Sequence, residues 1–97
     1  ALEGSAEGEG SQTIELCRAL LQNNFTWNKG AQLLKSMDMA EPERARQAVM
    51  GYMNSVLLGG KANPRAEAAM QAFGEADTYR NGKFAITIAV LDFLSLV

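Results

Sequence analysis

The residues of this chain that could carry chemistry are few, and their spacing does not suit catalysis. The sequence of 97 residues contains no histidine and one cysteine, Cys17. Histidine is the commonest general base and metal ligand, so a Cys–His nucleophile and the usual zinc sites are excluded. Two close carboxylate pairs are present, Glu41/Glu43 and Glu75/Asp77. Because residues two apart on a helix diverge, we expect solvated charges and no acid/base dyad.

The glycines of the sequence do not form a phosphate-binding loop. Their spacing matches neither the P-loop nor the dinucleotide-binding fingerprint. Without a base, metal or phosphate constellation, we predict that this chain alone is not an enzyme. We expect no catalytic, cofactor-binding or metal site, and no small-molecule substrate.

Length and charge indicate one small domain without a strong electrostatic signature. The formal net charge is −2, and Glu3, Glu7 and Glu9 lie in the first ten residues. The rest carries nine basic and eight acidic residues, a net of +1, which gives no footprint for nucleic acid. Residues 1–10 are rich in Gly and Glu, so we expect a disordered linker or cloning remnant.

Two further features suggest a cytoplasmic protein. No signal peptide is visible, and the final apolar run of fourteen residues is too short to span a bilayer comfortably. We therefore expect no membrane partner. Cys17 has no second cysteine to pair with and sits in an apolar pattern, so we expect a buried, reduced thiol.

Apolar periodicity and capping residues predict an all-α fold, an orthogonal bundle of about five helices within residues 11–97. The predicted helices cover residues 12–22 after an N-cap at Ser11, 27–37 after Thr26, 42–58 from Pro42, 64–80 after Asn63, and 84–97. Gly59-Gly60 and Asn81-Gly82 are the predicted stops. The β-branched residues in 84–90 also favour a strand, but no other segment alternates to pair with it.

The helical period assigns residues to the core. The predicted inward positions are Ile14, Cys17, Leu20, Leu21, Leu33, Leu34, Met37, Ala45, Val49, Tyr52, Met53, Val56, Leu57, Ala66, Ala69, Met70, Phe73, Ala76, Leu91, and Tyr79 or Asp77. Five methionines are spread over three segments, which favours core filling over a peptide groove. Trp27, beside Phe25, is expected to lock the first helix–helix turn. Basic side chains near helix ends are expected to be solvated: Arg44, Arg46, Lys61, Arg65, Arg80 and Lys83.

The final segment is apolar almost all the way round, since only Thr87, Asp92 and Ser95 interrupt residues 84–97. A helix of this kind must be covered on most sides. We predict that it is the central post of the bundle and that the other helices leave part of it exposed for association. The predicted interface residues are Thr87, Val90, Asp92, Phe93, Leu94 and Val97.

The order of elements resembles a known family. The string from Arg46 to Leu58 is followed by Asn63-Pro64-Arg65, then by the string from Phe73 to Lys83 and an apolar last helix. This layout, with the Leu-Leu pairs at 20–21 and 33–34 upstream, resembles the C-terminal helical domain of clamp-loader subunits. These are AAA+ ATPases of the DNA polymerase III delta/gamma and replication factor C type.

The resemblance implies a collar domain that holds subunits together, with ATP binding in a preceding AAA+ module. It implies clamp-loader-like subunits or a second copy as partners, and only indirect contact with DNA. Two other interpretations remain open: a free-standing adaptor that binds a peptide or helix, and a small nucleic-acid-binding helical domain.

Overall fold

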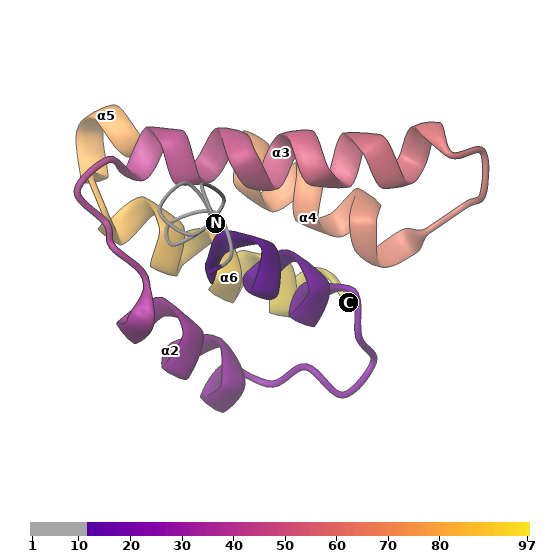
Figure 1. The fold of residues 1–97 in the computed structure, drawn as a ribbon, viewed down its shortest axis with the longest axis horizontal. Coiled ribbons are helices and arrows are strands. Elements are labelled where there is room, and N and C mark those ends of the chain that lie inside the picture. The colour runs from indigo at the N-terminus through magenta and orange to yellow at the C-terminus, as the bar shows by residue number, and fades with distance from the viewer. Residues whose placement is uncertain (1–11) are drawn as a thin grey trace, which may run out of the picture.

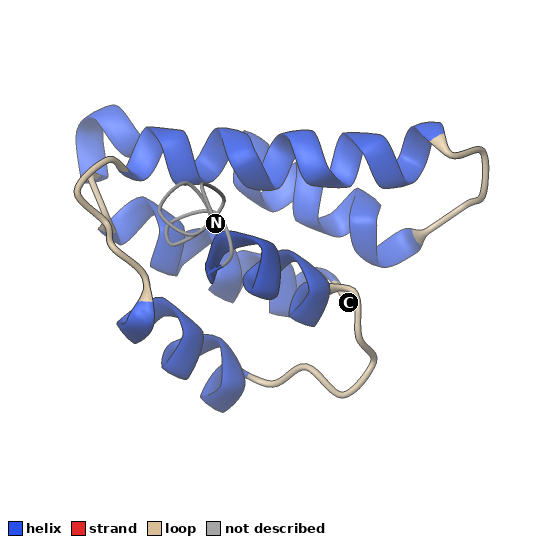
Figure 2. Ribbon diagram, viewed as in Figure 1, coloured by secondary structure: helices blue, strands red, loops and turns tan. Residues whose placement is uncertain are grey.

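A computed structural model describes residues 12–97, which form six helices and no strand (Figures 1 and 2). The elements are a first helix (residues 12–20), α2 (Trp27–Ser36), α3 (Pro42–Leu58), α4 (Pro64–Gly74), α5 (Thr78–Asn81) and α6 (Phe84–Leu96). This confirms the all-α prediction for the described part of the chain. The predicted Ser11 cap and the predicted disorder of residues 1–10 lie outside it.

Local signals set the starts of the helices as predicted. The Thr26 side chain accepts a hydrogen bond from the backbone N–H of Lys29 at 3.4 Å and caps α2. The Asn63 side chain accepts from Ala66 N–H at 3.1 Å and caps α4. Pro42 and Pro64 occupy first-turn positions, where their missing N–H leaves no bond unmade.

The predicted helix over residues 64–80 is wrong, because the structure divides it into two helices. α4 ends at Gly74, and Asp77 begins α5 by accepting a hydrogen bond from Arg80 N–H at 2.9 Å. An aspartate binds nearby backbone N–H groups more readily at a cap than within a helix. The break turns Tyr79 into solvent, with 86% of its surface exposed, although its position suggested a place near the core.

α6 is the central helix of the bundle, as predicted. In Figure 1 it runs through the middle of the molecule, with α3 and α4 on one side and α2 on the other. It contacts α2, α3, α4 and α5. Its enclosed side carries Ala85, Ile86, Ala89, Val90 and Phe93. None of the described helices combines the length and the apolar character needed to cross a membrane.

Most of the predicted core is confirmed, with two corrections besides Tyr79. Phe73 is fully buried, and all five methionines lie in the core or pack against it. Leu91 and Ile14 are instead 48% and 39% exposed. Their positions satisfy the helical period of the sequence, but the described helices cover those faces only in part.

The lock at the first helix–helix turn is made by Phe25 and not by Trp27. Phe25 is buried, and its ring meets the Phe93 ring edge-on, with centroids 6.0 Å apart at 70°. Trp27 lies at the start of α2 and stays 38% exposed. The aromatic residue just before the helix, rather than the one that begins it, therefore closes this end of the core.

Candidate association surface

The outer side of α6 carries a stripe of large apolar side chains. Phe84, Ile88 and Leu91 are 64%, 44% and 48% exposed. Residues spaced four and three apart share one face of a helix, so these three form a continuous surface. We call Phe84, Ile88 and Leu91 the α6 stripe. A contiguous apolar surface of this kind marks a site of association more often than a scattered exposed leucine does.

The structure places the predicted interface residues in three environments. Val90 and Phe93 are fully buried in the core and cannot reach a partner, which corrects that part of the prediction. Thr87 and Leu94 are half-buried, Asp92 is exposed, and Val97 is 50% exposed at the end of the chain described here. Thr87, Asp92, Leu94 and Val97 therefore flank or extend the α6 stripe.

The stripe itself was not predicted from the sequence, because a helix that is apolar all round does not reveal which of its faces packs inward. One signal was present. Ala85 and Ala89 lie on the enclosed side, and α4 buries four alanines, Ala66, Ala68, Ala69 and Ala72. Small side chains let two helices approach closely, so the alanines of α6 mark the side that meets a neighbour. The large side chains opposite them are the ones left in water.

Two charges border the stripe. The ammonium of Lys83 lies 5.9 Å from the centroid of the Phe84 ring, within cation–π range. Asp92 follows Leu91 directly and is exposed. The stripe therefore carries a positive charge near its N-terminal end and a negative charge near its C-terminal end.

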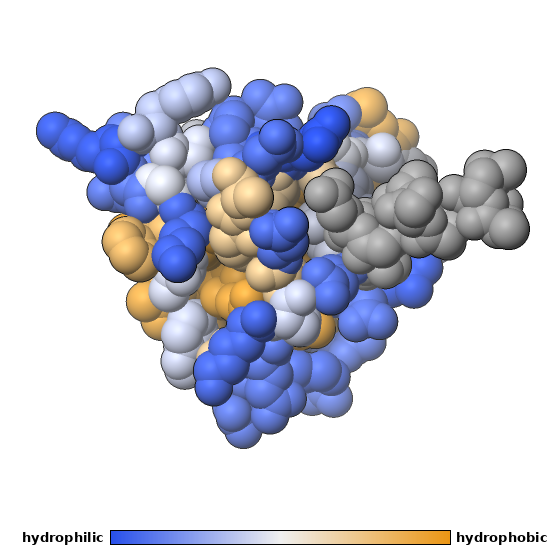
Figure 3. Space-filling model, turned by 60° about the vertical axis from the view of Figure 1, so that its left-hand side comes forward, coloured by the Kyte–Doolittle hydropathy of each residue, from blue (hydrophilic) through white to orange (hydrophobic). Residues whose placement is uncertain are grey.

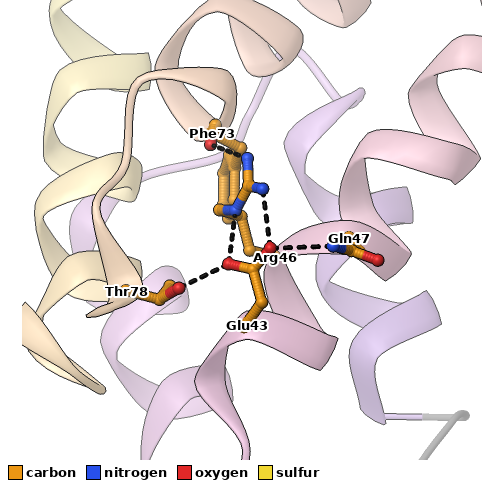
Figure 4. A network of polar contacts seen from close by, with 5 residues as sticks. All are labelled: Glu43, Arg46, Gln47, Phe73 and Thr78. Atoms are coloured by element: carbon orange, nitrogen blue, oxygen red, sulfur yellow. Dashed lines mark hydrogen bonds and ion pairs between the residues drawn. The ribbon is translucent and has the colours of Figure 1, made fainter.

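A polar network holds the elements that precede α6 (Figure 4). The Glu43 carboxylate accepts hydrogen bonds from Arg46 Nε at 2.8 Å, from Gln47 Nε2 at 2.8 Å, and from the Thr78 hydroxyl. Arg46 completes a two-pronged ion pair with Glu43 at 2.7 Å and donates to the Phe73 carbonyl at 3.2 Å. The expectation that Glu43 and Arg46 are solvated charges is therefore wrong.

This network joins α3 to the end of α4 and to α5, and so fixes the turn that leads into α6. Hydrogen bonds from Arg46, then from Thr78 and Gln47, lower the pKa of Glu43 from 4.5 to about 2. The same carboxylate raises the pKa of Arg46. Each group stabilises the charged form of its partner, so the pair is structural and offers no proton for catalysis.

Arg65 is a second basic residue with a structural task. Its Nε donates to the carbonyl of Leu20 at 2.8 Å, where the first helix ends. Its guanidinium also lies 5.3 Å from the centroid of the Phe93 ring. A cation that binds the last carbonyls of a helix satisfies groups that the helix leaves open. Arg65 therefore ties the first helix to α4 and α6.

An open recess of about 600 Å³ lies between the first helix, the α2–α3 loop and α3. Its walls are mainly apolar, from Ile14, Cys17, Met37 and Tyr52, with Asp38, Glu41 and Arg44 among its polar lining. Figure 3 shows, on the side where the α2–α3 loop lies, apolar side chains at the centre of the face, framed by polar ones. Burial raises the pKa of the Cys17 thiol to about 12, so this cysteine is no nucleophile.

Within residues 12–97, no three His, Cys, Asp or Glu side chains come together as a metal site. Comparisons with known proteins add no further assignment. No protein-family model matches the sequence, and neither a curated protein nor a solved structure matches it. The α6 stripe and its surroundings are therefore the features of this chain that bear on function.

Proposed function

We propose that this chain is an oligomerisation domain that holds protein subunits together. The observation that carries the proposal is the α6 stripe. The helix that packs against four others still leaves Phe84, Ile88 and Leu91 44–64% exposed. The stripe sits on a rigid central element, so a partner meets a preformed surface and orders little on binding.

The resemblance to the C-terminal domain of clamp-loader subunits supports a narrower role. We propose that the domain forms part of a collar in a cytoplasmic, clamp-loader-like DNA replication protein. In this role it contacts other subunits or a second copy, contacts DNA only indirectly, and carries no catalysis. Two of the basic residues near helix ends, Arg46 and Arg65, are already engaged inside the molecule.

Sedimentation velocity over protein concentrations from about 1 µM to about 1 mM tests the proposal. We expect association that increases with concentration and that is lost in Ile88→Asp, because an aspartate in the stripe must be desolvated when the surfaces meet. Leu58→Asp is the matched control, since Leu58 is 77% exposed at the end of α3, outside the stripe. A parent chain that stays monomeric throughout this range, or equal effects of the two variants, contradicts the proposal.

A second function, an adaptor that binds a peptide or partner helix, is favoured by the recess beside the α2–α3 loop. Its mainly apolar walls and its volume suit one or two apolar side chains of a partner. Ala48→Glu, in the wall of the recess, separates the two candidates. Under the oligomerisation proposal this variant associates as the parent does, whereas loss of association in Ala48→Glu alone favours the recess.

A further inference from the structure

We infer that the α6 stripe binds the same stripe on a second copy of this chain, with the two α6 helices antiparallel around a two-fold axis between Thr87 and Ile88. The inference rests on the proposed function and adds to it the partner and the geometry. In this arrangement Phe84 of each copy packs against Leu91 of the other, and Ile88 packs beside Thr87.

The order of residues along α6 supports the position of the two-fold axis. An isologous two-fold interface requires a surface that complements itself. Phe84 precedes the proposed axis by as many residues as Leu91 follows it, and Thr87 and Ile88 flank it directly. Antiparallel pairing about this axis therefore brings the two most exposed apolar side chains of the stripe into contact twice. It leaves the half-buried Thr87 and the exposed Ile88 at the centre.

The charges that border the stripe support the antiparallel orientation. Lys83 and Asp92 are also equidistant from the proposed axis. The Lys83 ammonium lies 5.9 Å from the centroid of the Phe84 ring, which brings it toward the stripe. Antiparallel pairing then sets this positive end of α6 against the negative end of α6 on the second copy, where Asp92 lies. A parallel pairing would instead place lysine beside lysine and aspartate beside aspartate. Exposed ion pairs add little affinity, but they discriminate between orientations.

The size of the surface sets the strength of binding. α6 has 13 residues and is about 20 Å long. One pair of helices of this length buries less than the roughly 1,600 Å² of a standard interface. We therefore expect a reversible dimer with a dissociation constant on the order of micromolar or weaker.

Cysteine cross-linking tests the orientation directly. About the proposed axis, two copies of residue 88 lie only about 1.5 Å apart along the helices, and two copies of residue 91 lie about 10 Å apart. Under mild oxidation we expect Ile88→Cys to form a disulfide dimer and Leu91→Cys alone to form none. A mixture of Leu91→Cys and Phe84→Cys should form the mixed dimer. The native Cys17 is buried, and its pKa of about 12 keeps it unreactive.

Charge reversal tests the pairing without touching an apolar side chain. By sedimentation, we expect Lys83→Asp and Asp92→Lys each to weaken the dimer roughly threefold to tenfold. The double variant should return to the parent's affinity, and an equimolar mixture of the two single variants should associate more tightly than either alone. Lys61→Asp in the α3–α4 loop changes the net charge as Lys83→Asp does and should leave the dimer unchanged.

The outcomes separate this inference from the proposed function. Two results would overturn the antiparallel dimer. One is self-cross-linking of Leu91→Cys in preference to Ile88→Cys. The other is a mixture of the two charge variants that associates no more tightly than either variant alone. If the chain still associates through the stripe in that case, the oligomerisation proposal stands. A chain that is monomeric at all concentrations overturns both.

Discussion

Phe73 and Leu91 show what one side chain contributes to this small core. Phe73 is fully buried, whereas Leu91 keeps 48% of its surface in water. We expect Phe73→Ala to lower the free energy of unfolding by about 3–5 kcal/mol, because it removes packed atoms and leaves a cavity. Leu91→Ala should lower it by about 0.5 kcal/mol or less, measured by urea denaturation at low protein concentration. A loss in Leu91→Ala as large as that in Phe73→Ala would mean that Leu91 is core and that no stripe exists.

Glu43 makes the stability of the fold depend on acid pH. Its pKa falls from 4.5 to about 2 on folding. A carboxyl group with a lowered pKa contributes stability that is fully present above its ordinary pKa and is lost as pH falls through the folded value. Between pH 4.5 and about 2, the parent should therefore lose stability more steeply than Glu43→Gln.

Glu41→Gln is the control for this experiment, measured by urea denaturation at several pH values. Glu41 pairs with Arg44 at 3.1 Å, but both side chains are about two-thirds or more exposed. Such a pair contributes little to stability, so the variant should keep the parent's pH slope. Parallel curves for the parent and Glu43→Gln would show that the network does not hold the carboxylate in solution.

Two glycines within helices differ in the space around them. A Cβ on Gly30 in α2 would lie 2.9 Å from Phe25 Cζ and 3.3 Å from Val90 Cγ1, whereas a Cβ on Gly51 in α3 would meet nothing within 4 Å. Gly51→Ala should raise the free energy of unfolding by about 0.5–1 kcal/mol through helix propensity. In Gly30→Ala the same gain is outweighed by a displaced Phe25 ring, with a net loss of about 1 kcal/mol. Thermal melting of both variants measures the difference, and a stabilised Gly30→Ala would show that the α2–core contact is loose.

The starts of helices could be predicted from the sequence where the capping residues lie beside them. Thr26, Pro42 and Asn63 mark the starts of α2, α3 and α4 within a few residues, because caps act over a single turn. The break before α5 was missed because Asp77 suits a cap and Tyr79 suits a helical seam, and only packing decides between them. The inward face of α6 was missed because its pattern is apolar on nearly every side, and only the small residues Ala85 and Ala89 distinguish the buried face.

For the molecule as a whole, the contacts that fix the arrangement join residues far apart in sequence. Thr78 meets Glu43 across 35 residues, and Arg65 meets the Leu20 carbonyl across 45. No period or spacing in the chain encodes such pairs, and Glu43 and Arg65 were therefore expected to be solvated. The local hints of the network were the spacings of Arg46 and Gln47 from Glu43, three and four residues along one helix.

The role of Arg65 in holding the first helix can be measured at Cys17. This thiol is 1% exposed in the first helix, so a thiol reagent reaches it only when that helix opens. Arg65→Met keeps most of the apolar stem but removes the hydrogen bond to Leu20. It also removes the buried Nη2, which has no hydrogen-bond partner among residues 12–97, so the change in global stability should be small. We expect labelling of Cys17 to become several-fold faster than the change in global stability explains, because the first helix opens locally.

Arg80→Met, at an exposed position of α5, should label at the parent's rate. If Arg65→Met labels no faster than Arg80→Met, the apolar contacts of Leu16 and Leu20 alone hold the first helix, and the tie from α4 contributes nothing to its closure.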